Sequence, residues 1–536
     1  MDRRKFINTT ALVGGAMVAA PSILSASVIG NSAIQIKPQW DKKTSGFKHS
    51  WSGLGNVDQM RWILRRDMQE QLAMCHKEIG LKHVRAVGIF DDEMWVFDKD
   101  PANYLNREKR SSKRYNWRVP YYIYDSLVNM GISPVVSTCF TPSGMKTGNE
   151  TCFDTRSNVT PPRDWKEWGS FVNTFVKGLV DRYGIEVVRN WYFEVWNEPN
   201  LGGFWTGGMD GYLKMYQIVY NAIKSVDPSL KVGGPSTAHT VWLSDLLNFG
   251  VKNNCMPDYI IGHIYNNDSV GGDPLSPFDG PQGDKENKSP NFASGITRGA
   301  RKLLDEASFK GEFHMNEWGL SWHPFAPVRE TANEAAFIVK TMSEVSQLAD
   351  YFAYWCLSDI YNQVGYGKEA FHGNYGMISL DGLRKPNYFA HQLLSRLGTE
   401  RVEIIGNSLD ELTNAIATKT KNGVQLAVYG FVNEYVPGDA MYNKEVTVSL
   451  PSTINPETIK LFQIDSVNNN ILADWKEMGS PDYLKPKEKE TLLAKNEFSA
   501  SSVKPKITKN QTGFELTFQI EMPGTVLVEA TNLTNN

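Results

Sequence analysis

The chain has 536 residues, which is enough for two or three domains and a large core. Its net charge of −3 gives no reason to expect a nucleic acid or an anionic membrane as a partner. Aromatic residues make up 12% of the chain and include 15 tryptophans, which suits a carbohydrate ligand because the C–H faces of sugars stack on aromatic rings, although a large aromatic core accounts for most individual tryptophans.

The N-terminus has the pattern of a cleavable export signal. Arg3-Arg4-Lys5-Phe6 precedes an apolar run from Ala11 to Ala20, which is too short to span a bilayer. The paired arginines resemble a twin-arginine signal, so residues 1–30 are expected to direct export to the periplasm or the exterior of a bacterium. No cysteine lies near the expected cleavage region, so no membrane anchor is expected after cleavage.

From residue 40 to 397, short apolar segments that predict strands alternate with amphipathic segments that predict helices. Eight such units predict an α/β fold, the (β/α)8 TIM barrel. Asp164 is expected to cap a helix that begins at Trp165, and Gly80 and Gly131 lie just past helix ends, where a left-handed residue is needed. The predicted strands are 47–51, 83–90, 134–140, 191–196, 231–234, 259–265, 313–317 and 351–356, and the predicted helices include 67–79, 121–130, 164–183, 211–226 and 332–348.

The most informative segment is the predicted strand at 191–196 and the residues that follow it. An apolar and aromatic run, typical of a buried parallel strand, ends abruptly in Asn197-Glu198-Pro199-Asn200. A carboxylate at the mouth of a buried strand is poorly solvated, so the pKa of Glu198 is expected to rise toward the range of a general acid. Pro199 ends the strand, and Asn197 can hydrogen-bond a substrate hydroxyl beside the acid. This combination suits cleavage of a sugar–oxygen bond.

A second strand-like run, 312–316, ends in Glu317. The C-terminal ends of barrel strands converge on one face, so Glu317 can meet Glu198 despite their separation in sequence. Retaining glycosidases need two carboxyl groups about 5–5.5 Å apart, one as acid/base and one as nucleophile. Each glutamate alone could be an ordinary surface or ion-paired residue, but the pair at barrel strand ends favours catalysis. Other polar or aromatic residues at predicted strand ends are His49, Asp91, Asp92, His263, Tyr265, Trp355 and Asp359.

Residues 400–536 contain short alternating or apolar runs separated by turns, which predict an antiparallel β-sandwich. A polar stretch at 485–495 is expected to be a solvated loop. The predicted strands are 425–431, 445–450, 458–464, 514–520 and 525–530.

Two long loops are expected at the catalytic face. Loop 266–289 is rich in Gly, Pro, Asp and Asn, and loops of this length are usually functional or mobile. Loop 106–118 is basic, and it is either a solvated excursion or a surface that binds an anionic sugar. Its cations are Arg107, Lys109, Arg110, Lys113, Arg114 and Arg118, against a single Glu108.

The five cysteines leave at least one thiol unpaired, and Cys139 and Cys152 could form a disulfide in an oxidising compartment. No Cys/His cluster has metal-ligand spacing, and no Gly-rich phosphate loop follows a strand. We therefore expect neither a metal nor a cofactor.

Short motifs lie all along the predicted barrel. They are Gly88-Ile89-Phe90-Asp91-Asp92, Tyr115-Asn116-Trp117, Val159-Thr160-Pro161-Pro162, the run from Glu194 to Trp205, Ser225-Val226-Asp227-Pro228, Val232-Gly233-Gly234-Pro235, Glu317-Trp318, Tyr354-Trp355, Ser358-Asp359 and Phe371-His372-Gly373. Together they resemble glycoside hydrolase family 39, the family of β-xylosidases and α-L-iduronidases in clan A, whereas a lone Asn-Glu-Pro would indicate only the clan.

The resemblance implies a retaining, exo-acting, β-xylosidase-like hydrolase that acts on oligo- or polysaccharides without a cofactor. By position, Glu198 corresponds to the acid/base and Glu317 to the nucleophile, which is expected to have an ordinary or low pKa. Asn197 corresponds to a contact of the sugar 2-hydroxyl. The substrate-binding residues expected are Asn197, His263, Tyr265, Trp355, His372 and Asp91.

Two positions depart from the pattern of the family's β-xylosidases. Val87 stands where a histidine is typical, and Gly319 stands where an asparagine is typical. A lost hydrogen-bond donor near the innermost sugar changes discrimination strongly, so a β-glucosidase, an arabinopyranosidase and a uronidase are alternatives. A non-catalytic carbohydrate-binding barrel is a further alternative, against which the presence of both carboxylates argues.

Overall fold

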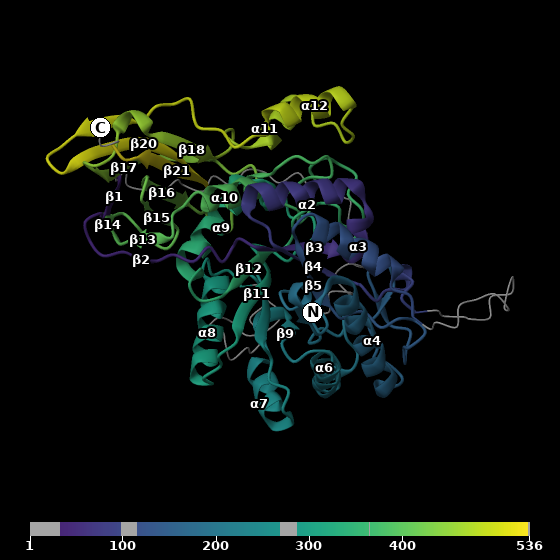
Figure 1. The fold of residues 1–536 in the computed structure, drawn as a ribbon. Helices are drawn as coiled ribbons and strands as arrows, with labels where there is room; N and C mark the ends of the chain where they lie inside the picture. Colours follow the sequence, from purple (N-terminus) through teal and green to yellow (C-terminus); the bar gives the residue numbers. More distant parts are fainter. Residues whose placement is uncertain (1–32, 98–114, 269–286, 364, 534–536) are drawn as a thin grey trace.

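The structure is a computed structural model that describes residues 33–97, 115–268, 287–363 and 365–533. It consists of an eight-stranded parallel barrel surrounded by helices, with two mainly antiparallel sheets packed together at one side of the barrel (Figure 1). The predicted fold class is therefore confirmed. The export signal, the cations between residues 107 and 114 and most of loop 266–289 lie outside the described residues.

The barrel strands follow one another around the barrel in chain order, and each pairs in parallel with the next. The first and last strands meet where the Leu357 N–H donates to the Asn56 carbonyl at 2.8 Å. The strands are β3 (Leu54–Gln59), β4 (His83–Val87), β5 (Ser133–Ser137), β8 (Tyr192–Glu194), β9 (Lys231–Thr237), β10 (Tyr259–Tyr265), β11 (Glu312–Gly319) and β12 (Tyr351–Tyr354).

Seven of these strands overlap the predicted ones, but the prediction for the first strand is wrong. Segment 47–51 precedes β3, and its alternating aromatic residues pack on one another, with the rings of His49 and Trp51 stacked at 4.6 Å. The actual strand contains buried Asn56 and Asp58. These polar side chains face the barrel interior, which removes the apolar pattern that marks the other strands.

The helices lie between consecutive strands and cover the barrel (Figure 1). The side chain of Asp164 accepts hydrogen bonds from two N–H groups of the first turn of its helix, and Gly80 ends a helix in the left-handed region at φ 74°. Both predictions are confirmed. The helices are α2 (Arg66–Ile79), α3 (Arg118–Asn129), α4 (Trp165–Tyr183), the short α5 (Ile185–Val188), α6 (Gly208–Lys224), α7 (Leu243–Asn253), α8 (Phe292–Glu306), α9 (Ala332–Val345) and α10 (Pro386–Ser395).

Aromatic side chains close the barrel at the N-terminal ends of its strands. Tyr192, Tyr259 and His314 lie with ring centroids 4.7 to 5.1 Å apart. Glu312 accepts hydrogen bonds from Lys231 and Tyr192 at the same end, both at 2.7 Å. The barrel interior is therefore filled at this end, and any cavity must open at the C-terminal ends of the strands.

Of the remaining sheets, the two large ones share a core of mostly aliphatic side chains, as in a sandwich, and the third pairs only β6 (Thr151–Cys152) with β7 (Ser157–Asn158). All five predicted strands are present. The first sheet has the order β14 (Ile404–Asn407), β1 (Ile34–Pro38), β17 (Tyr442–Pro451), β20 (Gly513–Met522) and β19 (Lys506–Lys509). The second has the order β18 (Lys460–Ile464), β21 (Gly524–Thr531), β16 (Gly423–Gly430), β15 (Thr413–Thr420), β13 (Glu400–Val402) and β2 (Ser45–Gly46).

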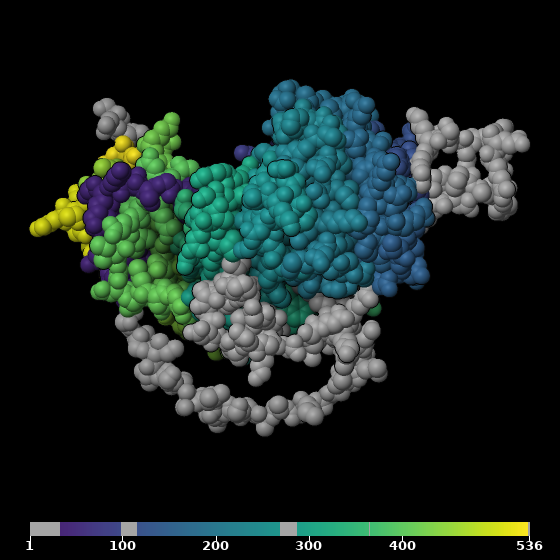
Figure 2. Space-filling view, turned by 90° about the horizontal axis from the view of Figure 1, so that it is seen from below, coloured from purple at the N-terminus to yellow at the C-terminus, as the bar shows by residue number. Residues whose placement is uncertain are grey.

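The N-terminal segment belongs to this sandwich, which the sequence did not indicate. β1 pairs antiparallel with β14 and parallel with β17, and β2 pairs with β13. In Figure 2 the purple N-terminal segment accordingly lies against the green surface of the sandwich rather than on the barrel. Pairing between strands about 400 residues apart leaves no local pattern in the sequence.

The predicted loop at 485–495 is wrong, because Pro486–Lys495 forms helix α12. Pro486 occupies the first turn, and Glu488 accepts a hydrogen bond from the Lys485 N–H at 2.8 Å. Leu492 is the one fully buried side chain of this otherwise polar helix and packs with Trp475. A single buried apolar residue produces no helical periodicity in the sequence, so the pattern did not predict this helix.

All five cysteines are thiols, so Cys139 and Cys152 do not form the disulfide considered from the sequence. Within the part of the chain that the structure describes, no helix combines the length and the apolar character needed to cross a bilayer.

The cap at Asp164 can be tested by stability. Asp164→Ala removes the acceptor of two N–H groups and is expected to cost about 1 kcal/mol of unfolding free energy. The shift of the midpoint of denaturant-induced unfolding measures this loss of unfolding free energy. Asp154→Ala, at an exposed turn position, is the matched control; an equal shift in both variants would show that the cap contributes nothing specific.

Candidate active site

A cavity of about 360 Å³ lies at the C-terminal ends of the barrel strands. Both predicted glutamates line it, together with polar and aromatic side chains that come from five different strand–helix connections. The lining residues are Val87, Phe153, Asn197, Glu198, Phe204, Tyr265, Glu317, Trp322, Trp355, Tyr361, Gln363 and Tyr375.

Glu198 lies just beyond β8 in a backbone conformation that the surroundings must hold in place. Its φ is 46° and that of Trp196 is 69°, both in the left-handed region that costs energy for residues other than glycine. The Glu198 N–H donates to the Ser236 carbonyl at 2.8 Å, and the Trp196 indole N–H donates to the Phe204 carbonyl at 2.8 Å. These bonds direct the 2% exposed Glu198 side chain into the cavity.

Glu317 lies in β11 and is almost fully buried. The Tyr265 hydroxyl donates to its Oε1 at 2.9 Å, and Arg85 donates to its Oε2 at 3.2 Å. Burial raises the pKa of Glu317 above its ordinary value; His263 and Arg85 oppose this effect and Glu198 adds to it. The expected ordinary or low pKa is therefore not found.

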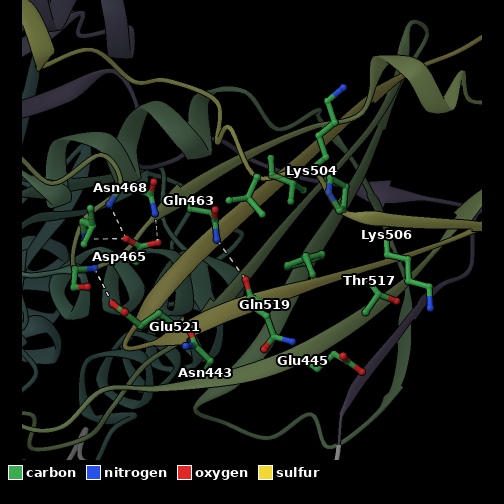
Figure 3. A pocket seen from close by; sticks show the side chains of 16 residues that line it. Asn443, Glu445, Gln463, Asp465, Asn468, Lys504, Lys506, Thr517, Gln519 and Glu521 are labelled. Atoms are coloured by element: carbon green, nitrogen blue, oxygen red, sulfur yellow. Dashed lines mark hydrogen bonds between the residues drawn. The ribbon is translucent and has the colours of Figure 1, made fainter.

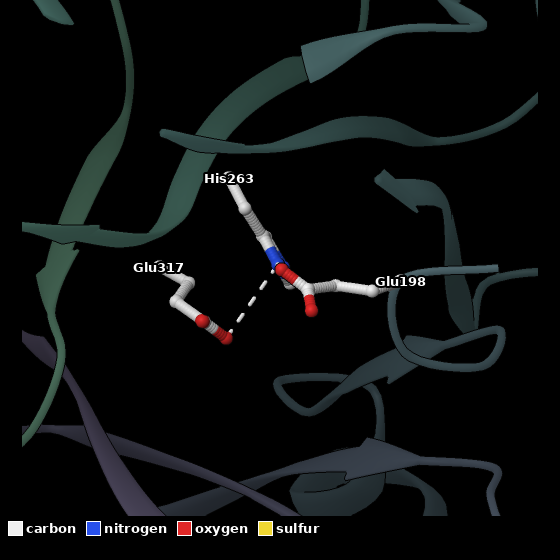
Figure 4. Close-up of side chains that lie close together, drawn as sticks. All are labelled: Glu198, His263 and Glu317. Atoms are coloured by element: carbon white, nitrogen blue, oxygen red, sulfur yellow. Dashed lines mark hydrogen bonds and ion pairs between the residues drawn. The ribbon is translucent and has the colours of Figure 1, made fainter. Parts of the chain in front are cut away.

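His263 stands between the two glutamates (Figure 4). Its Nδ1 lies 3.2 Å from Glu198 Oε1 and 3.5 Å from Glu317 Oε2. One atom from each of the three side chains lies within 4.8 Å of the other two, a separation that could also suit a bound cation. The imidazole hydrogen-bonds Glu198 and lies close to Glu317, so it links the two carboxylates directly.

A buried ion pair lies directly beneath these carboxylates. Arg85 of β4 and Glu194 of β8 are both fully buried, and the guanidinium donates twice to the carboxylate, at 2.7 and 2.8 Å. Although burial alone would raise it, the charge of Arg85 holds the pKa of Glu194 below its ordinary value. Arg85 also donates to Asn197 Oδ1 at 2.6 Å, so the amide nitrogen of Asn197 is the atom left to meet a substrate hydroxyl.

Aromatic side chains from two loops form one wall of the cavity. Trp322 follows β11 and Tyr375 follows β12, and the Tyr375 hydroxyl donates to the Trp322 carbonyl. Buried Arg329 stacks 3.9 Å from the Tyr375 ring and donates to the carbonyls of Ser321 and Gly373, which ties the two loops together. The guanidinium of Arg329, which lies outside the cavity, therefore holds this wall in place.

Gln363 supplies a fixed amide to the cavity. Its Nε2 donates to Asp58 at 2.6 Å, and its Oε1 accepts from the Tyr361 hydroxyl at 3.0 Å. Burial raises the pKa of Asp58 to about 6. When Asp58 is ionised it can only accept, which sets the direction of the Gln363 amide.

The structure gathers most but not all of the predicted binding residues. Asn197, Tyr265 and Trp355 line the cavity, and His263 lies directly behind it. Asp91 and His372 do not line it: Asp91 is buried against Ser157 at 2.6 Å with a pKa that burial raises to about 7, and the His372 Nδ1 lies 3.1 Å from the Glu369 carbonyl. Asp91 follows β4 and His372 follows β12, two strands whose C-terminal ends border the cavity, but neither side chain reaches it.

Several functional residues were not predicted from the sequence. Arg85 and Glu194 fall inside predicted strands. A charged residue within an apolar run is the signal from which a buried ion pair could have been predicted there. Of the two departures from the β-xylosidase pattern, Val87 lines the cavity, whereas Gly319 lies behind Tyr265, where an added Cβ would come within 3.4 Å of the ring.

A larger groove of about 1120 Å³ lies in the sandwich (Figure 3). Two of its three carboxylates serve local structure, because Asp465 accepts from the N–H groups of Val467 and Asn468 and Glu521 accepts from the Ser466 N–H. No pair of carboxylates there is bridged as Glu198 and Glu317 are, among the residues the structure describes. The barrel cavity is therefore the candidate active site.

Known proteins resemble this chain along most of its length. The family model described as "Glycosyl hydrolases family 39" matches residues 33–511. A protein named beta-xylosidase from Caldicellulosiruptor saccharolyticus is 32% identical over 491 residues, which cover 91% of this chain and 96% of that protein. A beta-xylosidase from Geobacillus stearothermophilus is 29% identical over 83% of this chain and 86% of its own. The crystal structure of a monomeric beta-xylosidase from Caulobacter crescentus CB15 has a TM-score of 0.79 at 26% identity and covers 94% of this chain and 99% of its own.

The bond from Tyr265 to Glu317 makes a prediction about pH dependence. Tyr265→Phe removes a donor that favours the ionised carboxylate, so the pKa of Glu317 should rise further. A hydrogen bond to a charged group contributes roughly 1.5–3 kcal/mol, which corresponds to about one pKa unit or more. The acidic limb of kcat/KM for an aryl glycoside should therefore move to higher pH. Tyr361→Phe, in the same cavity but bonded to Gln363, should leave that limb in place, and a limb unmoved by Tyr265→Phe would contradict the assignment.

Proposed function

The chain belongs to glycosyl hydrolase family 39, and on that basis we propose that it is a retaining, exo-acting glycosidase of β-xylosidase type. The observation that carries the proposal is the pair of buried carboxylates with oxygens no more than 4.8 Å apart on either side of His263. Retaining glycosidases hold their two carboxyl groups about 5–5.5 Å apart, whereas inverting ones need roughly 6.5–9.5 Å to admit a water molecule.

In the proposed mechanism, Glu317 attacks the anomeric carbon while Glu198 donates its proton to the leaving oxygen. A covalent glycosyl-enzyme forms, and Glu198, now ionised, takes a proton from water as that water attacks the same carbon. Glu317 leaves, and the sugar keeps its original configuration. Asn197 directs its amide nitrogen to the 2-hydroxyl, a contact that strengthens as the ring distorts.

The cavity supports exo action on a neutral sugar. Aromatic side chains from the loops after β11 and β12 bound it on one side, which suits a terminal sugar ring better than the middle of a chain. Among the described residues that line it, none is a lysine or arginine, and Arg85 beneath it is already paired with Glu194. A uronic acid would need a cation for its carboxylate. Two beta-xylosidases among the relatives, at 32% and 29% identity, support the xylose type.

A panel of aryl β-glycosides tests the function. Aryl β-D-xyloside is expected to be cleaved fastest, followed by sugars that keep its hydroxyl arrangement, and an aryl uronide is expected to be cleaved slowest. NMR of the first-formed product should show the configuration of the substrate. An inverted first product would refute the nucleophile role of Glu317, and hydrolysis of none of the panel would favour a carbohydrate-binding barrel.

Two variants with added azide test the individual roles. Glu198→Ala should slow poor leaving groups by about 10²–10⁴ and activated ones much less, because activated groups need little protonation. Azide should then restore turnover and give the glycosyl azide of retained configuration.

Glu317→Gly is the complementary variant. It should lose the covalent step, and azide should instead give the inverted glycosyl azide. If the two variants exchanged these products, the two roles would be reversed.

A further inference from the structure

Glu194 is a buried carboxylate that the proposed mechanism does not use. It lies at the end of β8, four residues before Glu198, and none of its atoms is exposed. A charge in this position costs free energy unless it is fully paired. Its partners are Arg85, the hydroxyl of Ser236 and, at 3.3 Å, the amide of Asn316.

The first route from Glu194 to the cavity passes through Arg85. All five N–H groups of the guanidinium have acceptors: two bonds go to Glu194, and one each to Asn56, Asn197 and Glu317. The negative charge of Glu194 offsets the positive charge that Arg85 presents to Glu317. Glu194 therefore sets how strongly the arginine favours the ionised nucleophile.

The second route passes through Ser236 and His263. An ionised carboxylate can only accept, so the single hydroxyl proton of Ser236 is donated to Glu194. The Ser236 oxygen, 3.0 Å from His263 Nε2, must then accept a hydrogen from that nitrogen. Arg85 lies 3.5 Å from the same nitrogen, but both hydrogens of its Nη2 are already donated to Glu194 and Asn197.

With a hydrogen held on Nε2, the neutral His263 ring turns the lone pair of Nδ1 toward both glutamates. Nδ1 therefore accepts a hydrogen bond from Glu198 while the acid carries its proton, and it has no hydrogen of its own to give to Glu317. We propose that Glu194 is a positioning residue that sets the proton arrangement of Glu198 and Glu317, acting through Arg85 on one side and through Ser236 and His263 on the other. The kinetic part of this proposal rests on the proposed function; the arrangement of protons does not.

The variant Glu194→Gln tests the first route. It keeps the size of the side chain, removes its charge and leaves Arg85 one acceptor fewer, so the charge of Arg85 acts more fully on Glu317. The acidic limb of kcat/KM should move to lower pH, while kcat at the optimum falls about tenfold or more because the nucleophile is less basic. The charged groups that face Glu317 are Arg85, His263 and Glu198, with the hydroxyl of Tyr265, and all remain in the variant.

A matched control is Glu312→Gln. Glu312 begins β11 at the opposite end of the barrel and is paired with Lys231 and His314. Loss of this charge should leave the acidic limb and kcat unchanged. If Glu312→Gln moved the limb as far as Glu194→Gln does, or if Glu194→Gln lowered activity without moving it, Glu194 would be only structural.

The second route is tested without activity by 15N NMR of the histidine ring nitrogens. In the parent protein, the neutral ring of His263 should carry its hydrogen on Nε2. In Ser236→Ala, which leaves the pair of Arg85 and Glu194 intact, that preference should be lost and the neutral ring should carry its hydrogen on Nδ1. A parent in which Nε2 loses its hydrogen while Nδ1 keeps one would overturn the proposal, even in a protein that hydrolyses no glycoside of the panel.

Discussion

The fold must hold one guanidinium inside a barrel where water cannot reach it. Arg85 meets this constraint by giving each of its five hydrogens to a different acceptor position, on side chains from β3, β8, β11 and the segment after β8. Removing any of these acceptors would leave a buried donor unsatisfied, at a cost of roughly 1–3 kcal/mol. The arginine therefore fixes the relative positions of the strands that carry Asn197 and Glu317. The geometry of the cavity follows from a pairing that lies beneath it.

The sequence predicted what local pattern can encode. Glu198 and Glu317 were found because each ends an apolar run, and barrel topology then brings such ends together. The polar residues that face the barrel interior were missed because they interrupt the apolar pattern of a buried strand. Asn56 and Asp58 interrupt it in β3, and Arg85 lies within the otherwise apolar β4. Asp91 and His372 follow strands in the same way as the residues that line the cavity, and only the course of the loop decides that they turn away.

The aromatic wall illustrates a second limit of local pattern. Trp322 and Tyr375 are 53 positions apart, and Arg329 joins their loops through backbone carbonyls, which carry no sequence information. Composition indicated an aromatic-rich protein, but not which rings face a ligand. Most tryptophans are indeed core residues: Trp168, Trp191 and Trp318 are fully buried in the main cluster.

The pairing of β1 with β17 has a consequence for how the chain folds as it is made. The strand at residues 34–38 emerges first from the ribosome, yet its parallel partner at 446–448 is synthesised more than 400 residues later. The barrel can form from neighbours in chain order, because each strand pairs with the next. The strand at residues 34–38 cannot complete its pairing until residues 446–448 have been made. The sandwich therefore closes a far longer stretch of chain than any pairing within the barrel does, and its assembly must follow synthesis of the barrel.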